Sequence, residues 1–198
     1  SGYARSTGKV GVCIVTSGPG ASNLITAVAA AYMDSIPLVI ITGQVKSTLI
    51  GRDVFQELDI TGATESFTKY NFLVKDAKSI PKTMKEAFYI ADTGRKGPVL
   101  VDIPMDIMEE DIDFEYPESV NIRGYKPTVK GHFGQIKKII DRIKISQRPL
   151  ICAGGGVILA NAQKELEQFV RKSHIPVVHT LMGKGCINEN NDYYVGLI

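Results

Sequence analysis

The sequence has too few cysteine and histidine residues for a disulfide framework or a metal centre. Its three cysteines, Cys13, Cys152 and Cys186, are far apart, and no two of them form a C-x-x-C pair. Its three histidines share no ligand spacing with each other or with nearby acids. We therefore assign no metal site within this chain. We interpret Cys13 and Cys152, which lie in apolar runs, as buried thiols that pack as small hydrophobic side chains.

Long apolar runs and an excess of charge of one sign are also missing. The densest apolar run, residues 36–42, is far shorter than the roughly 20 residues of a membrane-spanning helix. The opening residues lack the apolar core of a signal peptide. The 23 basic and 21 acidic residues give a net charge of +2, and no basic run is interleaved with aromatic residues. We expect a cytoplasmic protein that binds neither a membrane nor nucleic acid.

What is present is an alternation of strands and helices. At 198 residues and 44% hydrophobic content, the chain can form one large or two small domains. Residues 10–15 are as apolar as a central parallel strand, and an alanine-rich helix, residues 21–33, and a buried strand, residues 38–42, follow. The right-handed crossover rule makes these two strands parallel.

The same alternation continues to the end of the chain and predicts an α/β fold with parallel sheets. Between residues 109 and 130 the periodicity stops, which is typical of an interdomain linker. The further predicted strands are 72–74, 98–103, 149–153 and 175–180, and the further predicted helices are 80–92, 132–145 and 160–172.

A glycine-rich turn, Gly18-Pro19-Gly20, follows the first strand, where α/β proteins bind their ligands. It is not the dinucleotide fingerprint, because Asn23 stands where the third glycine would be. The pattern alone supports a ligand role and a bare turn equally. Asn23 is the informative residue, since its amide can donate and accept hydrogen bonds in the first turn of the helix.

A second glycine cluster, Gly154-Gly155-Gly156, favours nucleotide-type binding over a merely permissive turn. Neither cluster is followed by Lys-Ser or Lys-Thr, which argues against a P-loop. By itself, Arg95 is more typical of a solvated loop charge than of a phosphate clamp. Phe55 and Gln56 either line a site or pack within an irregular loop. No nucleophile elbow is present, so any chemistry depends on a cofactor or on parts of the protein outside these residues.

An ordered set of motifs resembles the large, catalytic subunit of acetolactate synthase (acetohydroxyacid synthase), a thiamine-diphosphate-dependent family. The resemblance covers essentially the whole chain. The motifs are GYAR (2–5), TSGPGASN (16–23), AYMDSIP (31–37), TGQV (42–45), FQE (55–57), RKGPV (95–99) and DIP (102–104).

The resemblance implies a fold and a reaction. Family members use thiamine diphosphate and Mg²⁺, bind FAD, and join two pyruvates, or pyruvate and 2-oxobutyrate, with loss of carbon dioxide. The products lead to valine and isoleucine. Their subunits have three α/β domains, so residues 1–117 are expected to be part of a pyrimidine-binding domain and residues 118–130 a linker. Residues 131–198 are then the first half of a Rossmann-like central domain that binds FAD.

The resemblance also assigns site residues. In the family, the aminopyrimidine pocket and the substrate position fall on one set of residues and the flavin contacts on another. The first set is Pro19, Gly20, Asn23, Gln56 and Phe55; the second is Arg95, Gly154, Gly155, Gly156, Thr180, Leu181 and Met182.

Several departures from the family matter as well. The family's essential glutamate lies just upstream of GYAR, and its diphosphate and Mg²⁺ domain has no counterpart in these residues, so we expect an internal fragment that is inactive by itself. Lys46 replaces a small residue or proline, and Met105 replaces a lysine, in segments that line the family's substrate channel.

The resemblance implies a parent that is a homodimer or tetramer, with a possible small regulatory subunit. Two alternatives stay open. One is another thiamine-diphosphate enzyme of the pyruvate oxidase or glyoxylate carboligase type, and the other is a non-catalytic nucleotide-binding module.

Overall fold

The chain forms two β-sheets, and the strands within each sheet are parallel. The computed structural model describes residues 1–198, and the contacts between residues separate them into two units, Ser1–Val129 and Lys130–Ile198. This α/β architecture with parallel strands is the predicted fold class.

The sheet of the first unit has the strand order β1-β2-β4-β3, and every neighbouring pair is parallel. The predicted parallel pairing of the first two strands is therefore confirmed. The strands are β1 (Gly11–Val15), β2 (Leu38–Gln44), β3 (Tyr70–Leu73) and β4 (Pro98–Pro104).

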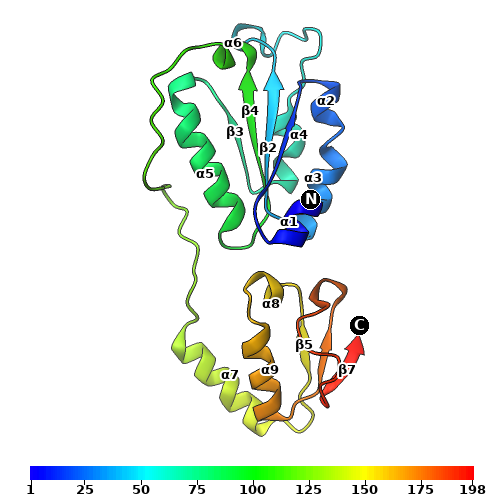
Figure 1. The fold of residues 1–198 in the computed structure, drawn as a ribbon. Helices are drawn as coiled ribbons and strands as arrows, with labels where there is room; N and C mark the ends of the chain where they lie inside the picture. Colours follow the sequence, from blue (N-terminus) through cyan, green and yellow to red (C-terminus); the bar gives the residue numbers. More distant parts are fainter. The chain divides into compact units, whose positions relative to one another are not determined.

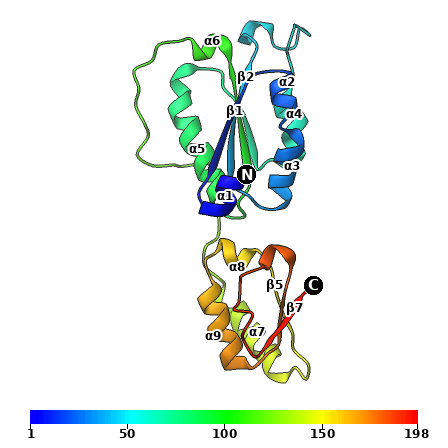
Figure 2. The same ribbon diagram turned by 45° about the vertical axis from the view of Figure 1, so that its right-hand side comes forward.

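Helices cover both faces of this sheet (Figures 1 and 2). On one face, α5 (Ile80–Asp92) packs against Val99 and Val101 of β4. On the other, α2 (Pro19–Ser22), α3 (Ile25–Met33) and α4 (Ile60–Thr64) pack with Leu100, which points the opposite way because side chains alternate along a strand. The unit thus has three layers and two apolar cores.

The short elements of the first unit lie in its connections and at its start. They are α1 (Gly2–Thr7), η1 (Ser47–Leu49), η2 (Glu65–Phe67), η3 (Ala77–Ser79) and α6 (Met105–Met108). Two residues of the predicted linker, Ile122 and Tyr125, pack against the core beneath α5, so this part of the segment belongs to the first unit.

The apolar sequence of the first strand predicted a central position in the sheet, and this prediction was wrong. β1 lies at an edge of the sheet, and the side chains of Val12 and Ile14 are 52% and 71% exposed. An apolar run shows that a strand suits burial, but not how many neighbours it has. The interpretation of two cysteines as buried thiols was also wrong, because Cys13 is only half-buried and Cys152 is exposed.

The predicted helix over residues 21–33 is two helices, with a break at Asn23 and Leu24. The Leu24 N–H donates to the Ala21 carbonyl, three residues back, so the backbone tightens between α2 and α3. In contrast, α5 has the predicted bounds. Gly8, with φ 70°, ends α1.

The second unit has a three-stranded parallel sheet in the order β5-β6-β7, with α9 packed against it through Val170. The third strand was not predicted from the sequence, and its pairing with β6 contains an irregularity at Val177 and Val178. The elements are α7 (Phe133–Ile145), β5 (Ile151–Ala153), α8 (Gly156–Leu159), α9 (Gln163–Ser173), β6 (Val177–His179), η4 (Leu181–Gly183) and β7 (Tyr194–Leu197).

No helix in either unit is both long enough and apolar enough to cross a membrane.

Candidate functional site

The carboxyl ends of β1, β2 and β4 form one edge of the first sheet, where α2 and α6 also lie (Figure 1). Gly18 precedes α2 with φ 57° and is buried. A Cβ atom at this position would lie 2.8 Å from the Gln56 carbonyl oxygen. Two predicted segments, the glycine turn and the Phe55–Gln56 turn, are therefore in close backbone contact, and only glycine allows it.

The predicted pocket residues border an open surface. Pro19, the first residue of α2, and Asn23, which follows its last, are both exposed. Gln56 is exposed with φ 61°, and the Phe55 side chain is 88% exposed. Gly20 is half-buried, and a Cβ atom there would lie 2.6 Å from the Thr16 methyl group.

A buried polar network lies directly beneath this surface. Leu38 and Ile40 of β2 face the α3 layer, and alternation carries Thr42 and Gln44 onto the same face. In the sheet register Thr42 pairs with Asp102 of β4, and the Thr42 hydroxyl donates to its carboxylate over 2.6 Å. The apolar layer therefore ends in a polar pair at the carboxyl edge.

Gln44 extends the network to the loop above. Its Nε2 donates to Asp102 Oδ2 over 2.9 Å and to the Leu58 carbonyl over 2.7 Å, while its Oε1 accepts from the Val45 N–H. The end of the segment that carries Gln56 is thereby tied to the sheet. Sequence reasoning missed this network, although a lone aspartate in the apolar run PVLVDIP was a usable signal.

Burial raises the pKa of Asp102 to about 6, even though the hydrogen bonds from Thr42 and Gln44 favour its charged form. The charge of Asp59 acts in the same direction as burial. At the start of the same loop, the Ser47 N–H and hydroxyl both donate to the Asp106 carboxylate, over 2.8 and 2.6 Å. These bonds lower the pKa of Asp106 and join η1 to α6.

Arg95 lies at the amino ends of the strands, on the opposite side of the sheet from the turns described above, and precedes the first residue of β4. Its guanidinium donates to Ser35 Oγ over 2.8 Å and to the Met33 carbonyl over 3.2 Å, and it lies over the Tyr32 ring. A cation at this position satisfies the carboxyl end of α3. The structure does not bring Arg95 together with the turns at Gly18 and Gln56.

In the second unit, the structure brings most of the predicted flavin residues together. The Thr180 N–H donates to the Ala153 carbonyl over 3.0 Å, which joins the turns after β5 and β6. A Cβ atom at Gly155 would lie 3.0 Å from the Met182 carbonyl oxygen. Gly154 and Gly155 are half-buried, and Gly156, Leu181 and Met182 are exposed.

The same unit contains a close contact that the sequence did not predict. A Cβ atom at Gly183 would lie 2.6 Å from the Ala153 carbonyl oxygen. The start of α8 adds N–H groups that have no acceptor within the helix.

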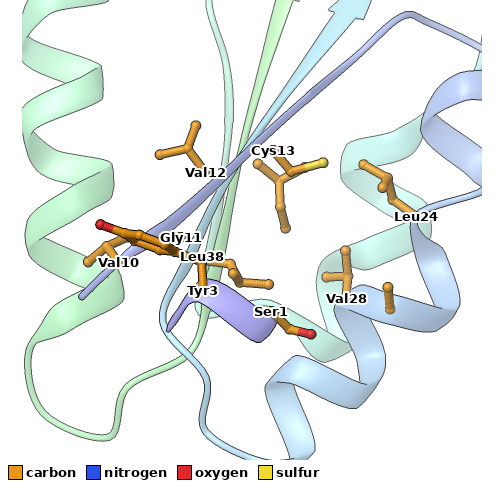
Figure 3. A pocket seen from close by; sticks show the side chains of 11 residues that line it. Ser1, Tyr3, Val10, Gly11, Val12, Cys13, Leu24, Val28 and Leu38 are labelled. Carbon is orange, nitrogen blue, oxygen red and sulfur yellow. The ribbon is translucent and has the colours of Figure 1, made fainter. Parts of the chain in front are cut away.

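A cavity of about 400 Å³ lies elsewhere, between β1, α1 and α3 (Figure 3). Its lining is mostly apolar and includes Tyr3, Val12, Cys13, Leu24 and Val28, but none of the predicted site residues. No group of three or more His, Cys, Asp or Glu side chains lies close enough to hold a metal ion.

Comparison with known proteins identifies the class. Residues 1–63 match the N-terminal TPP-binding domain of thiamine pyrophosphate enzymes, and residues 136–198 match the central domain of the same enzymes. The chain belongs to the thiamine pyrophosphate (thiamine diphosphate) enzymes.

Within that class, the chain is similar along its whole length to acetolactate synthase large subunits. It is 50% identical to those of Buchnera aphidicola subsp. Acyrthosiphon pisum and Haemophilus influenzae, and 46% identical to the isozyme 3 large subunit of Escherichia coli. Each comparison covers 100% of this chain and 35% of the relative, so the chain spans about a third of the length of these proteins.

The contact between Gly18 and Gln56 can be tested with Gly18→Ala. We expect the free energy of unfolding to fall by roughly 2–3 kcal/mol, because a methyl group would meet the Gln56 carbonyl in a backbone conformation that suits only glycine. Gly8→Ala is the matched control, because Gly8 also has positive φ but open space around it, and should cost roughly 1 kcal/mol. Equal losses in urea unfolding would contradict the close contact.

The raised pKa of Asp102 predicts a pH dependence. A carboxyl group whose pKa is higher in the folded protein stabilises the fold below its ordinary pKa, near 4, and this stabilisation is lost as the pH rises through about 6. Asp102→Asn cannot ionise, so its stability relative to the natural protein should rise by about 2 kcal/mol between pH 4 and pH 7. Chemical unfolding of both proteins across this range measures the difference; a constant difference would show that Asp102 titrates normally.

Proposed function

We propose that the chain is part of an acetolactate synthase that condenses two pyruvates, or pyruvate and 2-oxobutyrate, into an acetohydroxy acid with loss of carbon dioxide. The observation that carries the proposal is its identity of about 50%, over all its residues, to acetolactate synthase large subunits. The products would lead to valine and isoleucine.

The first unit would supply residues that hold thiamine diphosphate, which stabilises the carbanion character that decarboxylation and carbon–carbon bond formation require. Pro19, Gly20 and Asn23 would border the aminopyrimidine ring, and Gln56 would approach it from the opposite segment. The close backbone contact between Gly18 and Gln56 supports this arrangement, because it brings the two segments to one place. Exposed Phe55 would contact the substrate.

The role of the turn at Gly18 would be to shape a pocket for an uncharged ring. A helix amino terminus favours anions, but α2 has only four residues, and in this proposal the diphosphate and its Mg²⁺ are held elsewhere in the enzyme. Asn23, at the end of α2, offers both a donor and an acceptor to such a ring.

The second unit would hold FAD, without using its redox chemistry. The glycine turn 154–156 and the residues after β6 suit this role, because glycine lets the two backbone segments meet at the carboxyl ends of the parallel strands. The contacts would come from Gly154, Gly155, Gly156, Thr180, Leu181 and Met182.

We also propose that the enzyme is a homodimer or tetramer with a thiamine site between subunits. The partner that we propose for it is a small regulatory subunit, since the relatives are themselves named large subunits.

The reaction is tested with the protein in its natural length. Given pyruvate, thiamine diphosphate and Mg²⁺, it should form 2-acetolactate and release carbon dioxide, and omission of thiamine diphosphate should abolish both. Chromatographic identification of the product is the measurement. Acetaldehyde without acetolactate, or condensation of glyoxylate in preference to pyruvate, would assign the chain to a different enzyme of the same class.

The nucleotide assignment is tested by titration with FAD and NAD. FAD should bind and NAD should not, and Gly155→Ala should weaken FAD binding about tenfold, because its methyl group would push the Met182 backbone away. Gly2→Ala is the control, since Gly2 has open space and no positive φ. Isothermal titration calorimetry measures the binding of both nucleotides, and tight NAD binding without FAD binding would overturn the assignment.

A further inference from the structure

The Phe55–Gln56 turn has an unfavourable backbone and little packing to hold it. Both Asp53 and Gln56 have positive φ, 53° and 61°, although neither is glycine. The residues from Gly51 to Asp53 and the pair Phe55–Gln56 are exposed. A conformation of this kind persists only where other interactions determine it, so specific bonds must fix this turn.

One side chain supplies these bonds. The Glu57 carboxylate accepts the backbone N–H groups of Gly51, Arg52 and Val54, the last two over 3.3 and 3.1 Å. The Glu57 N–H in turn donates to the Val54 carbonyl over 3.0 Å. Donors from three residues thus converge on one carboxylate, and the chain between them closes into a loop with Phe55 and Gln56 at its end.

The charge state of Glu57 suits a holding role. These N–H donors lower its pKa, so the group is a carboxylate at neutral pH. Both of its oxygens already accept hydrogen bonds from the loop. A group held in this way is poorly suited to carry a proton in a reaction, but well suited to order the backbone around it.

The loop is also anchored on both sides of Gln56. Gln44 binds the Leu58 carbonyl from below, and Gly18 lies against the Gln56 backbone. With Glu57 holding residues 51–54, the position of Gln56 is fixed from three directions. Glu57 is the only one of the three that acts from within the loop.

We propose that Glu57 is a positioning residue that orders the loop of residues 51–57 and thereby presents Gln56 and Phe55 to the thiamine ring and the substrate. This inference rests on the proposed function for the roles of Gln56 and Phe55. The ordering of the loop by Glu57 does not depend on that function.

The test compares Glu57→Gln with the natural protein at its natural length. The variant keeps the shape of the side chain, but loses the charge and turns one acceptor oxygen into a donor group that faces N–H donors. Without cofactor, amide hydrogen exchange at residues 51–54 should become at least about tenfold faster. With cofactor, kcat for acetolactate formation should fall about 10- to 100-fold, with a smaller change in the KM for pyruvate.

Glu65→Gln is the matched control, because it makes the same chemical change at an exposed residue of the same unit. The Glu65 side chain forms no hydrogen bond that the substitution could remove. It should alter neither exchange nor kcat by more than about twofold. Glu57→Asp is a second variant that keeps the charge but has a side chain shorter by one methylene, so its carboxylate lies further from the N–H donors. It should fall between the natural protein and Glu57→Gln in both measurements.

The possible failures can be told apart. Unchanged exchange in both Glu57 variants would overturn the ordering role of the carboxylate. Faster exchange with kcat within twofold of the natural protein would overturn the positioning role. If the natural protein itself makes no acetolactate, the proposed function fails, and the affinity for thiamine diphosphate then replaces kcat: an affinity unchanged by Glu57→Gln overturns the positioning role, and a tenfold loss supports it.

Discussion

The first unit depends on the pairing of Thr42 with Asp102 at the end of its two central strands. An isolated carboxylate among apolar side chains would be costly, and here the hydroxyl of Thr42 and the amide of Gln44 both bind it. The pair marks the depth at which the apolar core ends. Above it, the same network holds the Leu58 carbonyl, so the irregular loop begins from a fixed point.

Both units contain close backbone contacts that depend on glycine. In each, chain segments after parallel strands must meet at the carboxyl edge without side chains between them, and glycine makes the contact possible. Gly18 lies against the backbone of Gln56, while Gly155 and Gly183 allow the turns after β5 and β6 to come into contact. Such contacts leave backbone surfaces that a flat ligand can approach. The two units differ in polarity, because the buried carboxylate has no counterpart in the core of the second unit.

Much of the fold could be predicted because it is local. The spacing of apolar residues predicted the bounds of α5, and the crossover rule predicted that the first two strands are parallel. The edge position of β1 and the exposure of Cys152 could not be predicted, since both depend on which elements cover a strand. The site residues came from motifs. The bonds of Asp102 were missed because they join residues about 60 positions apart through a sheet register that no local pattern contains.

The register between β2 and β4 also constrains how the sequence can change in length. A one-residue deletion or insertion within either strand would turn its later side chains to the opposite face. Asp102 would then point into the apolar layer beside Val99 and Val101, away from both of its donors. Length variation among relatives should therefore be rare in these strands and concentrated in segments such as residues 109–121, where no helix or strand forms.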